Sequence, residues 1–121
     1  MEQGVKGSLT IEVLQAISAR RSIRWHEGGV SDWSLLEWAG AMCGEAGEAA
    51  DVAKKIKRLA GRNGPAADEE GNTLLLQLGD ELADVLCYAV LVAERAEIDL
   101  AQAVRRKFNL VSARQGFPER L

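Results

Sequence analysis

The chain has 121 residues, enough for one domain but not for two, and residues 1–121 are expected to form a single domain. Hydrophobic residues make up 47% and charged residues 27%, a balance that is typical of a globular protein and excludes a disordered chain. No apolar run approaches the ~20 residues of a membrane span, and the N-terminus lacks the layout of a signal peptide. We therefore expect a cytoplasmic protein with no membrane partner.

Charge is unevenly distributed along the sequence. The net charge is −3, which argues against nucleic acid as a general partner. Residues 99–121 nevertheless carry +3, so the rest of the chain carries −6. Cys43 and Cys87 are far apart and His26 is the only further soft ligand, so no zinc set is expected. Both cysteines are predicted to be buried free thiols.

Apolar residues at helical spacing predict helices throughout the chain, and runs of β-branched residues with period-2 alternation are absent from the sequence. The first helix is expected to begin near Ser8 to Thr10 and to end before Gly28-Gly29. Ile11, Leu14 and Ile17 predict its apolar face.

The second helix is expected to follow Ser31 and Asp32, either of which can cap its N-terminus. Its apolar pattern continues to about Leu59. A polar connector over 61–72 then forms the longest predicted loop.

A third helix is expected over 73–96, with Asn72 or Thr73 as its cap. Asp99 is the predicted N-cap of a fourth helix over 100–113, because a glutamine follows three residues later in the capping-box position. Four amphipathic helices joined in this way predict an all-α, antiparallel four-helix bundle. Apolar surface left over favours completion of the bundle by dimerisation.

Two pairs of acidic residues interrupt the apolar pattern of the second and third helices. Glu45 and Glu48 are three residues apart, as are Glu81 and Asp84, so each pair lies on one helical face. If the two helices pack antiparallel, the pairs can face one another. Four carboxylates in a partly desolvated site repel one another unless a cation lies between them. Oxygen ligands without histidine favour Mg²⁺, with Mn²⁺ as a substitute, over zinc or iron.

The alternative is that these acids are ordinary solvated charges on helix exteriors. A single pair favours that interpretation, whereas two pairs at the same spacing on adjacent helices favour the metal site. Gly44 and Gly47 each cost a helix about 1 kcal/mol relative to alanine, which indicates close approach of a neighbouring helix or a ligand.

Glu45-x-x-Glu48 followed by Glu81-x-x-Asp84 resembles the signature of the all-α nucleoside triphosphate pyrophosphohydrolases. The residues around it, and the basic C-terminal tail, are similar to the MazG-like branch, and the similarity spans residues 33–118. The gap between the two pairs is longer than is usual in that family. The resemblance implies hydrolysis of (deoxy)nucleoside triphosphates to the monophosphate and pyrophosphate. It also implies a homodimer or homotetramer that clears non-canonical or surplus dNTPs.

The resemblance also implies roles for the four acids. Glu48, Glu81 and Asp84 are expected to bind Mg²⁺, and Glu45 to share a metal ion or to orient the attacking water. The phosphates need cationic partners as well. On the helix that carries Glu48, Lys55 is the first candidate, with Lys54 as the alternative. The tail that matches the family adds three predicted phosphate-binding residues, which are Lys107, Asn109 and Arg114.

The base needs a stacking surface. Trp33 lies on the same helical side as Glu45, and Tyr88 follows Asp84 by four residues, so both are predicted to bind the base. At least one of the three tryptophans is expected only to pack in the core.

Two rival functions differ in class from this hydrolase. A non-catalytic helical metal-binding or interaction protein would keep the cation site without turnover. A ferritin-like di-iron bundle needs Glu-x-x-His pairs, which this sequence lacks, so that alternative is discarded.

Overall fold

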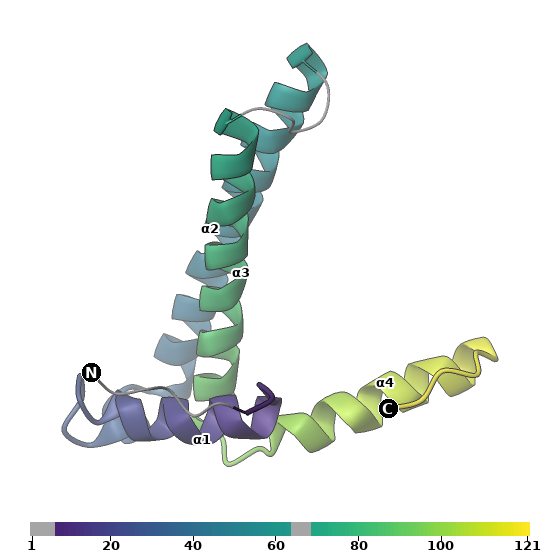
Figure 1. Ribbon diagram of the computed structural model, residues 1–121. Coiled ribbons are helices and arrows are strands. Elements are labelled where there is room, and N and C mark those ends of the chain that lie inside the picture. Colours follow the sequence, from purple (N-terminus) through teal and green to yellow (C-terminus); the bar gives the residue numbers. More distant parts are fainter. Residues whose placement is uncertain (1–6, 64–68) are drawn as a thin grey trace.

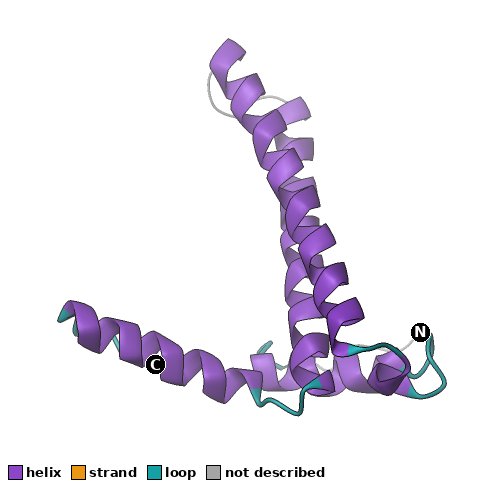
Figure 2. Cartoon of the chain, turned by 180° about the vertical axis from the view of Figure 1, so that it is seen from behind, coloured by secondary structure: helices purple, strands orange, loops and turns teal. Residues whose placement is uncertain are grey.

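A computed structural model of the protein describes residues 7–63 and 69–121. Its elements, in chain order, are α1 (Ile11–Ser22), the short 3-10 helix η1 (Gly29–Asp32), α2 (Leu35–Asn63), α3 (Glu69–Arg95) and α4 (Leu100–Gln115). Neither described range contains a β-strand, and the all-α prediction is confirmed (Figure 2). Across these same two ranges, no helix combines the length and the apolar character that crossing a bilayer requires.

The two longest helices, α2 and α3, run antiparallel and form a tall hairpin (Figure 1). α1 lies across the base of this hairpin, and α4 extends from the base away from it (Figure 1). The buried apolar side chains are Trp38, Ala49, Val52, Leu59, Val90, Leu91, Ala93 and Ala101. They come mainly from the facing sides of α2 and α3. This packing fits the predicted bundle, and its completion by a second copy stays a prediction.

α1 packs with part of the face predicted for it, because Ile11 and Leu14 are half-buried. Thr10 caps the helix, because its side-chain oxygen accepts a hydrogen bond of 3.1 Å from the Val13 N–H. The third residue of the expected face, Ile17, is 42% exposed, and the fully buried residues of α1 are Ser18 and Ser22. The Ser22 hydroxyl donates to the Ala19 carbonyl oxygen at 2.6 Å, so its burial leaves no unpaired donor.

α1 also ends at Ser22, several residues earlier than expected. Gly29 allows the turn that follows, because its φ of +62° is unfavourable for residues with a side chain. An added Cβ at this position would also lie 3.3 Å from the Ile23 side chain. The early end of α1 leaves room for η1.

The N-terminus of α2 is capped by Ser34 rather than by Ser31 or Asp32. The Glu37 N–H donates to the Ser34 hydroxyl at 3.1 Å, and the Ser34 N–H donates to the Glu37 carboxylate at 2.7 Å. This reciprocal pair is a capping box. Asp32 instead accepts from the Gly28 N–H at 3.0 Å. The predicted cap is therefore wrong, because η1 already uses those residues.

The predicted connector over 61–72 is largely helical where it is described. α2 continues to Asn63 and α3 begins at Glu69, while residues 64–68 lie outside the described ranges. Asn72 and Thr73 are inside α3, and the Thr73 hydroxyl donates to the Glu69 carbonyl oxygen at 2.9 Å. Neither residue therefore caps the helix.

α4 begins as predicted, because the Asp99 carboxylate accepts from the Gln102 N–H at 3.1 Å. Gly116 ends it with a φ of +70°, in the left-handed conformation that glycine favours. Gln15 of α1 ties the start of α4 to the base of the molecule. Its side-chain amide donates to the Ile98 carbonyl oxygen at 2.8 Å and accepts from the Leu100 N–H at 3.2 Å.

Both cysteines are free thiols, but neither is fully buried. Cys43 is exposed and Cys87 is half-buried, so the expectation of two buried thiols is wrong. Cys43 lies on a side of α2 that the rest of the described chain leaves open to solvent.

Candidate functional site

The antiparallel hairpin brings acidic residues of α2 and α3 together. Glu45 of α2 and Glu81 and Asp84 of α3 each offer a carboxylate oxygen, and these three atoms lie within 4.8 Å of one another. Glu45 and Glu81 are half-buried and Asp84 is exposed. Glu48, one turn after Glu45, is exposed but close enough to raise the pKa of both Glu45 and Glu81. All four predicted carboxylates thus lie in one region, hereafter called the carboxylate cluster.

The surroundings of these carboxylates disfavour their charged forms. Burial, followed by the neighbouring Glu48 and Asp84 carboxylates, raises the pKa of Glu45 from its ordinary 4.5 to about 7. Burial and the Glu48 carboxylate also raise the pKa of Glu81. One oxygen of each residue, Oε2, is buried and has no hydrogen-bond partner in the described chain. Buried ionised oxygens without partners are unstable, so the cluster needs a proton or a cation.

The donor set fits a hard divalent cation. Mg²⁺ binds carboxylate oxygens at about 2.0–2.1 Å, so ligands on opposite sides of one ion are about 4.2 Å apart. The 4.8 Å limit for the three oxygens is close to this spacing. The group contains only carboxylates, which suits Mg²⁺, Mn²⁺ or Ca²⁺ better than softer metals.

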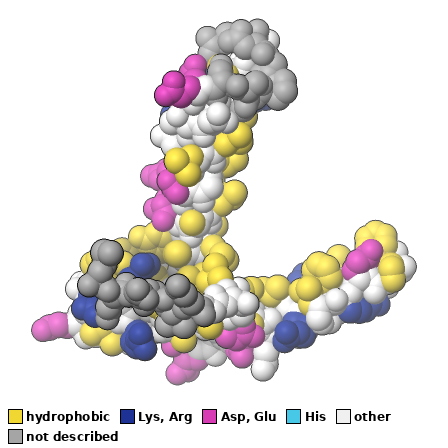
Figure 3. All heavy atoms as spheres, in the orientation of Figure 1, with side chains coloured by type: hydrophobic (Ala, Val, Ile, Leu, Met, Phe, Trp, Pro, Cys, Tyr) yellow, Lys and Arg dark blue, Asp and Glu magenta, His cyan; other side chains and the backbone are white. Residues whose placement is uncertain are grey.

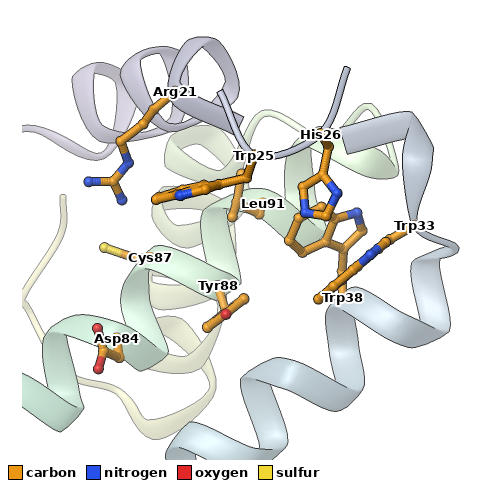
Figure 4. Close-up of a pocket in the computed structure, with 9 residues that line it drawn as sticks. All are labelled: Arg21, Trp25, His26, Trp33, Trp38, Asp84, Cys87, Tyr88 and Leu91. Carbon is orange, nitrogen blue, oxygen red and sulfur yellow. The ribbon is translucent and has the colours of Figure 1, made fainter. Parts of the chain in front are cut away.

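A pocket of about 280 Å³ lies beside the carboxylate cluster, between α1, the hairpin and the segment 23–34 that includes η1, hereafter called the η1 region (Figure 4). Its lining residues are Arg21, Trp25, His26, Trp33, Trp38, Asp84, Cys87, Tyr88 and Leu91. Asp84 is therefore shared by the pocket and the cluster. A ligand in the pocket would have one end next to the cation site.

Aromatic rings form one end of this pocket. The Trp33 and Trp38 rings are 4.5 Å apart between centroids, and the His26 ring lies 5.0 Å from Trp33. Tyr88 lies 6.3 Å from Trp38. The Trp38 indole N–H donates to the Val30 carbonyl oxygen at 2.8 Å, which fixes this ring in the core. The rings offer flat apolar faces of the kind on which a base stacks.

Comparison with known proteins agrees with this arrangement. A family model described as the MazG nucleotide pyrophosphohydrolase domain matches residues 35–115. The match begins where α2 begins, ends where α4 ends, and includes all four carboxylates. The chain belongs to the MazG nucleotide pyrophosphohydrolase family. Searches of curated proteins and of solved structures give no significant match.

The family match leaves out part of the pocket. Arg21, Trp25, His26 and Trp33 lie before residue 35, so α1 and the η1 region supply one wall from outside the matched MazG range. Tyr88, Asp84 and Trp38 lie inside it. The pocket therefore joins the hairpin that carries the carboxylate cluster, inside the matched range, to a wall from residues that precede it.

The two residues predicted to bind the base, Trp33 and Tyr88, both line the pocket. Trp38 is the tryptophan that packs, being 2% exposed, while Trp25 is 66% exposed at the rim. The sequence reasoning missed Arg21 as a pocket residue. Its spacing of four residues from Trp25 was the only local signal, and that spacing does not predict that either residue lies near α3.

The predicted phosphate-binding residues lie elsewhere in the described chain. Lys55 is exposed on α2 and does not line the pocket. Lys107, Asn109 and Arg114 are on α4, which extends away from the hairpin (Figure 1). The Asn109 side chain accepts from the Leu121 N–H at 2.8 Å and donates to the Leu121 carbonyl oxygen at 3.3 Å. Their role at the phosphates stays a prediction.

Proposed function

We propose that the protein hydrolyses (deoxy)nucleoside triphosphates between the α and β phosphates, giving the monophosphate and pyrophosphate. The observation that carries the proposal is the position of Asp84, which belongs both to the carboxylate cluster and to the aromatic pocket. A nucleotide has the matching layout, with a flat base at one end and phosphates at the other. Membership of the MazG family supports the same reaction class.

The proposed cofactor is Mg²⁺, with Mn²⁺ as a substitute, held by Glu45, Glu48, Glu81 and Asp84. When bound, the cation offsets the charge of the phosphates and lowers the pKa of water. The two unpartnered buried oxygens, on Glu45 and Glu81, support such a ligand set. Glu45 is proposed to orient the attacking water or to share a metal ion, because the groups around it are the carboxylates of Glu48, Glu81 and Asp84.

Trp33 and Tyr88 are proposed to hold the base. Both rings lie on the aromatic side of the pocket, so the sugar and phosphates of a bound nucleotide would extend toward Asp84 (Figure 4). The proposed biological role is removal of non-canonical or surplus dNTPs. Nucleoside triphosphates are cytoplasmic metabolites, so the reaction is placed in the cytoplasm.

A second copy of the chain is proposed to complete the bundle, as a homodimer or as half of a homotetramer. α4 carries apolar side chains along one side and Lys and Arg along the other (Figure 3). Phe108 is 42% exposed on α4, and Leu82 is 55% exposed on α3. The second copy is proposed to cover both. The basic α4 of one copy complements the acidic hairpin of the other, which would bring Lys107 and Arg114 to the phosphates.

Gly44 and Gly47 of α2 face open space among the described residues of one chain. An added Cβ at Gly44 or Gly47 would meet no heavy atom within 4 Å in the described part of the chain. The neighbouring-helix explanation for these glycines is therefore wrong within one chain, because α3 does not approach them. A ligand or the second copy is the proposed occupant of this space.

Subunit complementation tests the shared site. Glu81→Gln and the double variant Lys107→Ala/Arg114→Ala should each be inactive alone. Co-expressed as mixed dimers, they should recover about a quarter of wild-type activity, because half of the dimers hold one intact site. No recovery in verified heterodimers, or a monomer in sedimentation, would contradict the shared site.

The hydrolase proposal is tested by incubating the purified protein with Mg²⁺ and a panel of canonical and modified (d)NTPs, with products separated by anion-exchange chromatography. We expect monophosphate and pyrophosphate in equal amounts from at least one nucleotide, and none with EDTA. Glu81→Gln should abolish turnover. Asp80→Asn is the matched control, because Asp80 is exposed, adjacent in sequence and outside the cluster.

Two outcomes would contradict the proposal. Orthophosphate with a diphosphate would mean a different scissile bond. No product from any nucleotide, with a folded protein that binds Mg²⁺, would favour the non-catalytic metal-binding protein instead.

A further inference from the structure

Arg21 lines the pocket, and its side chain has no charged partner within the described residues. It lies in the last turn of α1, and its guanidinium group is 5.0 Å from the centre of the Trp25 ring. Among residues 7–63 and 69–121, no hydrogen bond or salt bridge engages this group. A guanidinium has five N–H donors in a planar fork, and Arg21 is exposed at the pocket rim, so its donors are open to a ligand that replaces water.

Asp84 lines the same pocket from α3, yet the two opposite charges form no ion pair in the described chain. Figure 4 shows Arg21 on the side of the pocket where Cys87 and Asp84 lie, while the Trp33, Trp38 and His26 rings occupy the other side. A cation therefore lies near the end of the pocket that adjoins the carboxylate cluster.

We propose that Arg21 binds a phosphate group of the nucleotide, an inference that rests on the proposed function. Guanidinium groups form paired, charge-assisted hydrogen bonds with phosphate oxygens, which fixes the orientation of the phosphate. The face of the Trp25 ring restricts the guanidinium in the unliganded pocket, so less side-chain freedom is lost when the phosphate binds.

This assignment gives α1 a direct part in substrate binding. Arg21 lies before residue 35, where the match to the MazG family model begins, so the family match does not include this contact. It also supplies, from within the same chain, a cation that Lys55, Lys107 and Arg114 do not bring to the pocket.

Two other roles for Arg21 make different predictions. A positive charge in the last turn of a helix interacts favourably with the helix dipole, but Arg20 occupies the same turn and does not line the pocket. Arg20→Ala is therefore the matched control for that effect. A role in reading the base would require Arg21 to affect nucleosides as strongly as nucleotides.

Tryptophan fluorescence provides the binding measurement, because all three tryptophans of the chain line this pocket. The probes are the four common deoxynucleosides, their 5′-monophosphates, and triphosphate analogues with a methylene bridge between the α and β phosphorus atoms, in Mg²⁺ buffer. Arg21→Ala should weaken binding of the phosphate-bearing probes at least tenfold, since hydrogen bonds between charged groups are lost. Nucleoside binding should change less than twofold.

Arg21→Lys should recover part of the affinity, because lysine keeps the positive charge but lacks the paired N–H donors of a guanidinium. Arg20→Ala should bind like the wild type. Equal weakening of nucleosides and nucleotides, or no weakening at all, would overturn the assignment while leaving the hydrolase proposal standing. A wild-type protein that binds no phosphate-bearing probe and releases no pyrophosphate would overturn both.

Discussion

Trp38 packs in the core and also lines the pocket, so Trp38→Phe should lower the free energy of unfolding. The indole is 2% exposed, and its N–H donates to the Val30 carbonyl oxygen at 2.8 Å. Phenylalanine removes that hydrogen bond. Val30 is half-buried, so water can partly replace the donor, and the loss is about 1 kcal/mol.

The smaller ring also removes apolar volume equivalent to about two methylene groups, which adds about 1–2 kcal/mol at about 0.8 kcal/mol each. The total of about 2–3 kcal/mol corresponds to a fall of roughly 6–15 °C in Tm for a chain of this length. Thermal unfolding followed by far-UV circular dichroism, at two protein concentrations, is the assay. Trp25→Phe is the control, because Trp25 is 66% exposed and its replacement should cost less than about 0.5 kcal/mol. Equal Tm values for the two variants would refute this description of the core.

The carboxylate cluster, the Gln15 hydrogen bonds and the end of α4 can each be tested by unfolding measurements. The Tm of the metal-free protein should fall as pH rises from about 5 through 7. Burial, together with the carboxylates of Glu48, Asp84 and Glu81, raises the pKa of Glu45 to about 7, so this residue binds more protons in the folded state than in the unfolded state. Saturating Mg²⁺ or Glu45→Gln should flatten that slope, and an unchanged slope in the variant would contradict the assignment. Gln15→Ala should lower the free energy of unfolding, measured in urea, by about 1–3 kcal/mol, because it removes the side-chain partner of the Ile98 carbonyl and of the Leu100 N–H. A loss below about 0.5 kcal/mol would mean that water replaces both hydrogen bonds, and would contradict this role of Gln15. Gly116→Ala should cost about 1–2 kcal/mol in the same assay because of its φ of +70°, whereas Gln115→Ala should be nearly neutral.

The parts of the site that the sequence predicted depend on local periodicity. Acids three residues apart share a face of any helix, so the pairs Glu45–Glu48 and Glu81–Asp84 needed only an antiparallel hairpin to meet. The cap at Asp99 was predictable for the same reason, since it depends on residues within one turn.

Other features depend on contacts that are distant in sequence. The fully buried residues of α1 are Ser18 and Ser22 because of how α1 crosses the hairpin, and apolar periodicity wrongly added Ile17 to the packed side. Arg21 reaches the pocket only because α1 lies across the base of α3. The cap at Ser34 was obscured because η1 takes up the preceding residues. The direction of α4 follows from the turn before it, which helical periodicity does not specify.

A titration with Mn²⁺, followed by electron paramagnetic resonance of the free ion, tests most directly whether carboxylates of α2 and α3 jointly form a cation site. We expect the wild type to bind the ion, and both Glu45→Gln and Glu81→Gln to bind it at least tenfold more weakly, since each helix supplies a ligand. Asp80→Asn should bind like the wild type. Equal affinity in all four proteins, or weakening by only one of the two glutamate variants, would contradict a site shared between the two helices.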